Sequence, residues 1–411
     1  MELITIVTYL SVYIGLVSVT FYVLSFFKDK KNVRSLFTDD ELPEVTVIIP
    51  AYNEEKTIAK TIESIIASDY PNFQVFVIDD GSKDDTLKIA KKFENHKVKV
   101  FHKENNGKGS ALNFGIEKAK TPIIFTMDAD TRVEKDAMKK MVRYFKNEKV
   151  MCVVPSMVTE KPKTIFQRVQ DIEYLSGLFL RKAFAAVNSI YNAPGAFSAY
   201  RKSFFDKYGG YEEGNITEDL EMSLKVQFNG FTVENCQEAI AYTVTPSKFK
   251  ELLFQRRRWY FGLVKNLIKY RKIISPKYGD MGMFIIPIAL VSIFFSVFMI
   301  LYYTIKIMFN IHQELLFLQS INFNFSGIFK IDAYVIERFL FLTISNPVLI
   351  FVFIFVVLLG LYLLYASKKV RIPLSVIFNL ALFFLLFPFL FGFWWVVSLF
   401  YALFTKKIKW R

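Results

Sequence analysis

The chain has 411 residues, a formal net charge of +14, and a composition that is 53% hydrophobic and 17% aromatic. A soluble domain of this size would be less apolar, so membrane segments are expected. The positive charge is compatible with nucleic acid, an anionic bilayer surface or anionic substrates. Two distant cysteines, Cys152 and Cys236, exclude a disulfide framework and fit a reducing compartment, and three scattered histidines argue against a histidine-bound zinc site.

The first predicted element is an apolar segment that is long enough to cross a membrane. Residues 3–27 carry no charge over 25 positions, which suffices for a transmembrane helix. In a signal peptide, basic residues precede the apolar core, whereas here the cations follow it in KDKKNVR. The positive-inside rule therefore predicts that the chain from residue 28 onward is cytoplasmic.

The region from Asp39 to about Lys277 alternates strand and helix patterns. Short β-branched segments predict strands, and apolar residues at helical spacing predict helices between them. This order indicates an α/β fold, a mostly parallel sheet with helices on both faces. The predicted strands are 45–52, 74–82, 97–103 and 122–130, and the predicted helices are 57–68, 85–94 and 110–119.

Acidic or polar side chains follow three of these strands. Ligands of such sheets bind beyond the carboxyl ends of the strands, so the sequence predicts that these side chains meet at one edge. Converging acids repel one another unless a cation joins them, and oxygen ligands without sulfur or imidazole suit Mg²⁺ or Mn²⁺. The three pairs are Asn53 with Glu54, Asp79 with Asp80, and Asp128 with Asp130.

The Asp128–Asp130 pair also has a structural interpretation. A helix is expected over Val133 to Met138, and Asp130 or Thr131 would be a suitable residue to cap it. Similarly, Gly81 and Ser82 after the Asp79–Asp80 pair make a good turn. Two such pairs in register after two strands favour a binding site over a pair of solvated turns.

Six motifs occur in the order found in family 2 glycosyltransferases, and the chain resembles that family over roughly residues 43 to 265. More narrowly, it looks like the processive membrane synthases of poly-N-acetylglucosamine, cellulose, chitin and hyaluronan. The resemblance implies a GT-A-like glycosyltransferase domain inserted between transmembrane helices. The motifs are VTVIIPAYNEEKTI, VIDDGSKDDT, NNGKGSALNFGI, FTMDADT, TEDLEMSLKV and QRRRW.

The resemblance also assigns roles to individual residues. A UDP-sugar would be bound by the ends of the first strands, by the lysine of NNGKGS, by the D-x-D pair and by the Q-x-x-R-W motif. Asp128 and Asp130 would hold the metal, Asp219 would be the catalytic base with Glu218 beside it, and the acceptor sugar would lie near Trp259 and the small residues of NAPGAF. The implied UDP-sugar residues are Ala51, Tyr52, Glu54, Asp79, Asp80, Lys108, Asp128, Asp130, Gln255, Arg258 and Trp259, and the implied acceptor residues are Pro194, Gly195, Ala196 and Trp259.

These residue types suit the chemistry. An inverting transfer needs a base opposite the departing diphosphate, and a carboxylate such as that of Asp219 accepts the acceptor proton. Arg258 is permanently charged and binds phosphate oxygens in a forked geometry. The alternatives remain open: Thr217 would cap a helix over DLEMSLKV, and QRRRW would belong to a basic helix on anionic lipid.

Two amphipathic segments are predicted at the membrane surface. Residues 247–274 combine many cations with interleaved apolar residues, and residues 163–187 carry an apolar stripe. They are expected to hold the active site against the membrane. The stripe consists of Ile165, Val169, Ile172, Leu175 and Phe179.

Apolar sequence resumes after residue 281. Residues 282–303 and 347–365 each predict one crossing, and the basic residues 367–371 should face inward. The block 373–404 contains Pro373 and Pro388 and is either one kinked helix or a hairpin; its basic end favours the hairpin. The predicted domains are 1–28 (transmembrane), 39–245 (glycosyltransferase), 246–280 (interface helices) and 281–411 (transmembrane).

The sequence therefore predicts a multi-pass enzyme of the cell membrane. It would polymerise a UDP-sugar, UDP-N-acetylglucosamine being favoured, into a β-linked polysaccharide, using Mg²⁺ or Mn²⁺ and with an accessory membrane subunit as an open question. The alternatives are a cellulose-, chitin- or hyaluronan-type product, a non-processive transferase acting on polyprenyl phosphate, and a catalytically inert transporter. Nucleic acid is not an expected partner, and NNGKGS lacks the first glycine of a P-loop.

Overall fold

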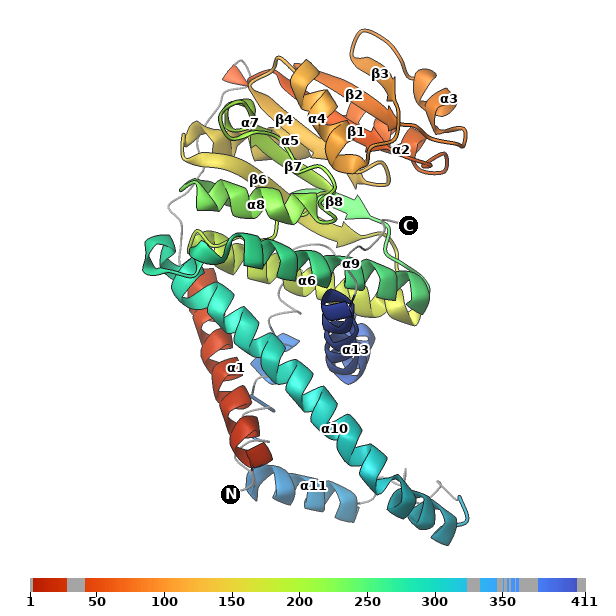
Figure 1. Ribbon diagram of the computed structural model, residues 1–411, viewed down its shortest axis with the longest axis vertical. Helices are drawn as coiled ribbons and strands as arrows, with labels where there is room; N and C mark the ends of the chain where they lie inside the picture. The colour runs from red at the N-terminus through yellow and green to blue at the C-terminus, as the bar shows by residue number, and fades with distance from the viewer. Residues whose placement is uncertain are drawn as a thin grey trace.

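The computed structural model describes residues 3–27, 41–323, 333–345 and 376–404, with a few isolated residues between 350 and 361. The largest element of the fold is an eight-stranded sheet with the strand order β3-β2-β1-β4-β7-β6-β8-β5. Figure 1 shows this sheet at one end of an elongated molecule. The strands are β1 (Val45–Ala51), β2 (Phe73–Asp80), β3 (Val98–Lys103), β4 (Ile123–Met127), β5 (Arg132–Val133), β6 (Val150–Thr159), β7 (Phe197–Arg201) and β8 (Thr232–Thr243).

The first half of the sheet is parallel, as the alternating pattern predicts. β1 pairs in parallel with both β2 and β4, and β2 pairs in parallel with β3. Beyond β4 the sheet is mixed: β7 runs antiparallel to β4 and to β6, while β6 and β8 are parallel. The carboxyl ends of β1, β2 and β4 consequently lie at one edge, where ligands of such sheets bind.

Helices cover both faces of the sheet, as predicted. Strand residues alternate between the faces, so that Val47 and Ile49 of β1 pack in one core while Ile48 packs in the other. The first core includes α2 (Ile58–Ile66), α3 (Thr86–Lys91) and α5 (Ala137–Val142). The second includes α4 (Lys108–Lys118), α7 (Lys202–Tyr208) and α8 (Glu218–Phe228).

The expected helix over Val133 to Met138 is wrong. Arg132 and Val133 form the short strand β5, which pairs with β8, and α5 begins only at Ala137. The β-branched Val133 is better placed on the edge of the sheet than in a helix. Neither Asp130 nor Thr131 therefore caps a helix, because the N-cap of α5 is Asp136.

Two long helices, α6 (Ile165–Ala186) and α9 (Phe249–Lys269), form a layer between the sheet and the apolar helices (Figure 1). Four residues of the predicted stripe on α6 are buried: Val169, Ile172, Leu175 and Phe179. Ile165, the fifth residue of the stripe and the first residue of the helix, is 55% exposed. Leu178 completes the buried face instead.

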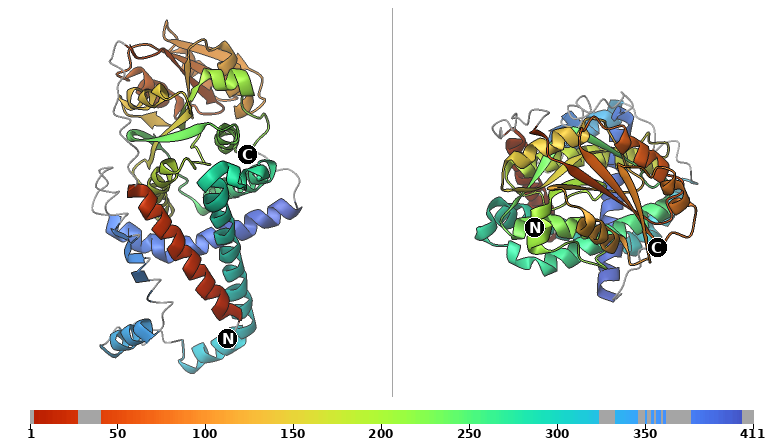
Figure 2. Two further views of the ribbon diagram at one scale, coloured as in Figure 1. Left: turned by 90° about the vertical axis from the view of Figure 1, so that its left-hand side faces the viewer. Right: turned by 90° about the horizontal axis from the view of Figure 1, so that it is seen from above.

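In the described part of the chain, three helices are long and apolar enough to cross a membrane: Ile6–Ser25 within α1 (Leu3–Phe27), Met281–Ile311 and Phe378–Ala402 within α13 (Val376–Phe404). The second consists of a π-helical turn, Met281–Ile285, followed by α10 (Ile286–Ser320), and is longer than the crossing predicted at 282–303. α1 and α10 both run away from the sheet (Figures 1 and 2), and Phe21 of α1 contacts Phe284 of the π-helical turn that precedes α10.

The hairpin favoured for residues 373–404 is wrong, because α13 is one continuous helix with Pro388 inside it. Every backbone polar group in an apolar setting needs a hydrogen-bond partner. A helix that lacks only the hydrogen bond lost at Pro388 leaves fewer such groups unpaired than a tight turn does. α13 packs its apolar face against α6 through Leu380 and Phe383. The left panel of Figure 2 shows α13 running across α1 and α10 rather than along them.

The close crossing of α13 and α10 depends on a glycine. A Cβ at Gly392 would lie 2.3 Å from Cγ1 of Ile300, so only glycine permits this approach. The structure also contains α11 (Ala333–Ser345), which was not predicted, and short 3₁₀ segments at Arg143–Lys146, Arg271–Ile273 and Pro276–Tyr278. The crossing predicted at 347–365 lies largely outside the described residues, and the basic segment 367–371 lies wholly outside them.

Candidate active site

The strand ends bring the predicted acids to one edge of the sheet. Ala51, the last residue of β1, is paired with Asp79 of β2, and Asp128 follows directly after β4. Tyr52 follows β1 with a 38% exposed side chain. The next residue, Asn53, has a positive φ of 56° and turns the chain toward α2.

A lysine joins the D-x-D motif to the TED motif. The ammonium nitrogen of Lys108 lies 2.7 Å from Oδ1 of Asp128 and 2.8 Å from Oε1 of Glu218. Burial by itself would lower the pKa of Lys108, but the surrounding carboxylates hold that pKa well above its ordinary value. Segments that are 90 residues apart in sequence therefore share one cation.

The loop before β7 closes the same site. The backbone N–H of Gly195 donates to Oδ2 of Asp219 at 2.7 Å, and the N–H of Asp128 donates to the carbonyl of Ala196 at 2.9 Å. The hydroxyl of Ser198 donates to the carbonyl of Pro194 at 2.7 Å and fixes the start of the loop. The predicted acceptor loop thus lies between the D-x-D and TED motifs.

Gly195 is required at its position by space. A Cβ built on it would lie 2.7 Å from Oδ2 of Asp219 and 3.1 Å from Nζ of Lys108. Such distances are shorter than ordinary van der Waals contact. Any side chain here would displace the carboxylate, the ammonium or both.

Two carboxyl groups of the site have raised pKa values. Burial raises the pKa of Asp219 to about 6, with the charge of Glu218 as the next cause and Lys108 opposing it. Burial, followed by the charges of Asp128 and Glu54, raises the pKa of Asp130 to about 7. Clusters of titrating groups of this kind are typical of functional sites.

The Asp79–Asp80 pair is engaged differently from what the resemblance implies. Both carboxyl oxygens of Asp80 already accept hydrogen bonds, from Lys103 at 2.7 Å, from the N–H of Asn106 at 3.2 Å and from the N–H of Gly107 at 2.8 Å. Asp80 therefore holds the loop that precedes α4. In Asp79, by contrast, Oδ1 is buried and has no hydrogen-bond partner among the residues that the structure describes.

The scattered histidines suggest no role for His102 in the sequence, but this residue lies beside Asp79 of the candidate site. Its ring Nδ1 lies 2.7 Å from Oδ2 of Asp79, which is fully buried, while the imidazole side chain is 54% exposed. The signal in the sequence was its position on β3 directly opposite Asp79, but only strand pairing reveals that register.

The capping alternative for TED is only half right. Thr217 occupies the N-cap position of α8, yet its side chain makes no capping hydrogen bond. Its hydroxyl oxygen instead accepts from the side-chain amide of Asn266 at 3.0 Å. A Cβ at Gly262 would lie 2.2 Å from the same hydroxyl, so α9 passes directly against the start of α8.

Within QRRRW, Arg256 makes the most extensive contacts in the described part of the chain, although it is not one of the residues that the Q-x-x-R-W pattern specifies. Arg256 is 1% exposed, and its guanidinium makes a two-pronged ion pair with Glu173 of α6, at 2.8 and 2.7 Å. The guanidinium also lies 4.3 Å from the ring centroid of Trp259 and 5.3 Å from that of Trp394. Arg256 thereby joins α6, α9 and α13.

The other residues of this motif lie on the same helix. Gln255 has a buried side-chain oxygen with no hydrogen-bond partner in the described part of the chain, which is costly unless a ligand or water satisfies it. Trp259 is half-buried, with Arg256 against its ring. The described contacts between α9 and the acidic site run through Gly262 and Asn266, one to two turns beyond Trp259.

The donor set at the sheet edge fits a divalent metal bound together with a diphosphate. Among the residues that the structure describes, no three Asp, Glu, His or Cys side chains form a ready-made metal site. Mg²⁺ characteristically takes one or two carboxylates and completes its shell with water and phosphate oxygens. Asp128 and Asp130 supply that number, and a bound cation would offset the burial and the neighbouring negative charges that raise the pKa of Asp130.

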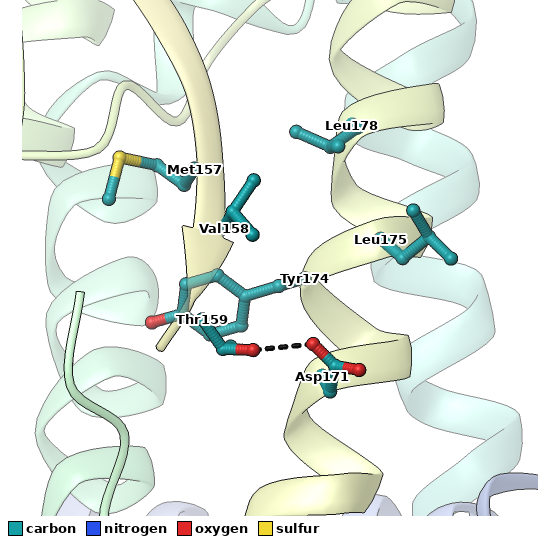
Figure 3. A pocket seen from close by; sticks show the side chains of 7 residues that line it. All are labelled: Met157, Val158, Thr159, Asp171, Tyr174, Leu175 and Leu178. Atoms are coloured by element: carbon teal, nitrogen blue, oxygen red, sulfur yellow. Dashed lines mark hydrogen bonds between the residues drawn. The ribbon is translucent and has the colours of Figure 1, made fainter. Parts of the chain in front are cut away.

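A hollow lies between β6 and α6 (Figure 3). The hydroxyl of Thr159 points toward the carboxylate of Asp171 and donates a hydrogen bond to it. Apolar side chains line the rest, and the space is too narrow for water. This hollow is therefore a packing gap rather than a sugar site. Its lining residues are Met157, Val158, Thr159, Asp171, Tyr174, Leu175 and Leu178.

The mixed sheet with its acidic edge defines a GT-A-like fold. A solved mannosyltransferase from Pyrobaculum calidifontis, in complex with GDP-Man and Mn²⁺, superposes with a TM-score of 0.56, covering 88% of this chain and 98% of that chain at 17% identity. At that identity the likeness concerns the fold alone.

More particularly, residues 46–209 match the model of glycosyl transferase family 2. It is also similar to two curated poly-β-1,6-N-acetyl-D-glucosamine synthases. That of Staphylococcus aureus (strain COL) is 29% identical over 258 residues, which are 62% of this chain and 63% of the relative. That of Staphylococcus epidermidis is 31% identical over 244 residues, which are 58% of this chain and 59% of the relative. Each alignment spans less than two thirds of the relative's length.

Proposed function

We propose that the protein is an inverting, metal-dependent glycosyltransferase that polymerises UDP-N-acetylglucosamine into a β-linked polysaccharide. One observation carries the proposal: Lys108 and Gly195 join Asp128 of the D-x-D motif to Glu218 and Asp219 of the TED motif. The proposed site for the donor phosphates and the proposed base therefore lie next to each other at the edge of the sheet.

Asp219 is the proposed base. Its two oxygens accept backbone N–H groups from Gly195 and Leu220, at 2.7 and 2.8 Å, which fix the carboxylate while leaving lone pairs for an acceptor proton. Glu218 is held on Lys108 and is less free to take part in proton transfer. A base with a pKa near 6 is mostly charged at neutral pH and still basic enough to remove a proton.

As Asp219 removes the proton of an acceptor hydroxyl, that oxygen attacks the anomeric carbon from the face opposite the nucleotide. The bond from that carbon to the diphosphate oxygen breaks, and UDP leaves with the electron pair. The configuration at the anomeric carbon is thereby inverted, and the proton remains on Asp219 until the product departs.

Asp128 and Asp130 are the residues that would hold Mg²⁺ or Mn²⁺. When bound, such an ion neutralises charge that develops on a departing diphosphate. Asp79, with its unpartnered buried oxygen, is the proposed contact to the base of the nucleotide. Tyr52, Glu54 and Lys108 surround the remaining donor site.

Binding of the acceptor is proposed at the loop of Pro194, Gly195 and Ala196, which contacts both acidic motifs. Trp259 offers a flat ring to a pyranose, and Arg258 and Gln255 lie on the same helix. Export of the polymer is supported by the likeness to the synthases and by the position of α6 and α9 between the sheet and the apolar helices. A membrane location with a cytoplasmic sheet domain completes the proposal.

The test uses the purified full-length chain with a panel of UDP-sugars and Mg²⁺ or Mn²⁺, and mass spectrometry of the products. UDP-N-acetylglucosamine should give a polymer, and Asp219→Asn should abolish it while UDP still binds. Asp206→Asn is the matched control, because Asp206 only pairs with Lys202 on the surface. A product with a single sugar on a lipid acceptor would refute polymerisation, and a normal rate for Asp219→Asn would refute the base.

A further inference from the structure

A buried ammonium lies where the acids of the candidate site converge. The side chain of Lys108 is 19% exposed, and its nitrogen is within hydrogen-bond distance of both Asp128 and Glu218. Gly195 approaches the same nitrogen so closely that a Cβ there would lie 3.1 Å away. The lysine is thus held inside the site and not on its rim.

Without these acids, the position of Lys108 in the fold would be unfavourable for a cation. Lys108 is the first residue of α4, and the N-terminus of a helix carries partial positive charge. The preceding Gly107 has a φ of +90°, which side-chain-bearing residues rarely adopt, and its N–H donates to Asp80. The carboxylates, and not the helix, therefore keep the ammonium in position.

A divalent metal on Asp128 would share that carboxylate with the ammonium of Lys108. Oδ1 of Asp128 is 2.7 Å from the ammonium, so a metal on this carboxylate would either displace the lysine or lie close to a like charge. Both are unfavourable while the site contains only the protein's own carboxylates. A nucleoside diphosphate brings additional negative charge, which would stabilise the metal and the ammonium together.

We propose that Lys108 is an internal counter-cation that keeps a divalent metal out of the site until a nucleoside diphosphate arrives. This inference rests on the proposed function, because it takes Asp128 and Asp130 as the metal ligands. It makes binding of the metal and of the nucleotide strongly cooperative. It also explains how three acids remain together when no metal is bound.

The experiment measures Mn²⁺ affinity of the purified full-length chain from the electron paramagnetic resonance signal of free Mn²⁺, with and without UDP. The wild type should bind Mn²⁺ weakly alone and much more tightly with UDP. Lys108→Met removes the charge at similar length, and its affinity for Mn²⁺ alone should rise by roughly tenfold or more. Lys108→Arg retains the charge and should remain close to the wild type.

Lys269→Met is the matched control. Lys269 also bridges two carboxylates, those of Glu212 at 3.0 Å and Glu221 at 2.8 Å, but lies on α9 outside the acidic site. This variant should keep the dependence of Mn²⁺ binding on UDP. In Glu218→Gln, Lys108 keeps its ion pair with Asp128 alone. This variant should bind Mn²⁺ without UDP more weakly than the wild type, whereas Lys108→Met should bind it more tightly.

The outcomes separate this inference from the function on which it rests. If the wild type binds Mn²⁺ with UDP, and Lys108→Met binds Mn²⁺ alone no better than the wild type, the counter-cation role is refuted and the metal site stands. If Lys108→Met fails to fold, Lys108→Gln, which removes the same charge but keeps a polar side chain, decides the question by the same rise in affinity for Mn²⁺ alone. If the wild type does not bind Mn²⁺ even with UDP, the metal site and this inference are both refuted.

Discussion

The N–H of Gly195 lies 2.7 Å from Oδ2 of Asp219 and donates a hydrogen bond to it, so the acceptor loop directly orients the proposed base. The contact requires glycine, because a Cβ at this position would lie 2.7 Å from the same oxygen. The position of the base is therefore set by a residue without a side chain. This relationship leads to the first prediction.

Gly195→Ala should lower turnover by about 100-fold, since a displacement of about 1 Å in a catalytic group has effects of that size. UDP affinity should change less than turnover, because the new Cβ would lie 2.7 Å from Asp219 but 3.1 Å from the ammonium of Lys108. Steady-state rates and UDP titrations measure the two quantities. Gly15→Ala in α1 is the control, because its Cβ would have no atom within 4 Å. Equal rates for both variants would contradict the prediction.

The pH dependence of the reaction should report Asp219. A base acts in its charged form, and burial followed by the charge of Glu218 raises the pKa of Asp219 to about 6. The rate should therefore fall as the pH is lowered through about 6, by about tenfold per pH unit below it. Profiles of kcat/KM against pH measure this inflection.

Glu218→Gln tests whether the charge of Glu218 helps to raise the pKa of Asp219. It removes a negative charge that raises the pKa of Asp219, so any residual activity should show its inflection at a lower pH. A profile whose inflection does not move would mean that another group controls the rate.

The ion pair between Arg256 and Glu173 should dominate the stability of the interface layer. Arg256→Met leaves Glu173 without its partner, and breaking a buried pair in this way costs about 3–5 kcal/mol. Unfolding in detergent by denaturant measures the loss. Arg132→Met breaks the more exposed pair with Glu160, whose side chains are 46% and 34% exposed, and should cost only about 0–1 kcal/mol. Similar losses for both variants would contradict the assignment.

Pro388→Ala should leave α13 intact and either not change or raise its stability. A proline inside a helix removes one hydrogen bond and clashes with the preceding turn, at a cost of about 3 kcal/mol or more in an ordinary helix. Thermal unfolding measures the change. A clear loss of stability would instead indicate that Pro388 belongs to a turn, as in the hairpin that the basic C-terminal end favours.

Much of the sheet domain is predictable because its signals are local. β1, β2, β3 and β4 lie within a few residues of the predicted strands, and α2, α3 and α4 lie between them. Alternating β-branched segments and apolar residues at helical spacing encode these elements directly. The start of α5 was missed because Val133 continues a helical pattern in sequence, whereas pairing with β8 draws it into a strand.

The limits of the sequence are visible in single residues. QRRRW shows three arginines of equal charge, and only the packing of α9 against α6 distinguishes Arg256 from its neighbours. His102 and Asp79 are 23 positions apart, and strand pairing alone places them opposite each other. The apolar block 373–404 contains the same residues whether it forms a helix or a hairpin, and its packing against α6 decides between them.

The sequence by itself determined the order of strands and helices, the acidic strand ends and the apolar segments, because hydrophobic period and turn chemistry act over short distances. Only the tertiary structure decided that Lys108 stands between Asp128 and Glu218 and that Gly195 holds Asp219. Those contacts join residues from 20 to 110 positions apart. Their distances follow from how the sheet, α4 and α8 pack, which no local pattern encodes.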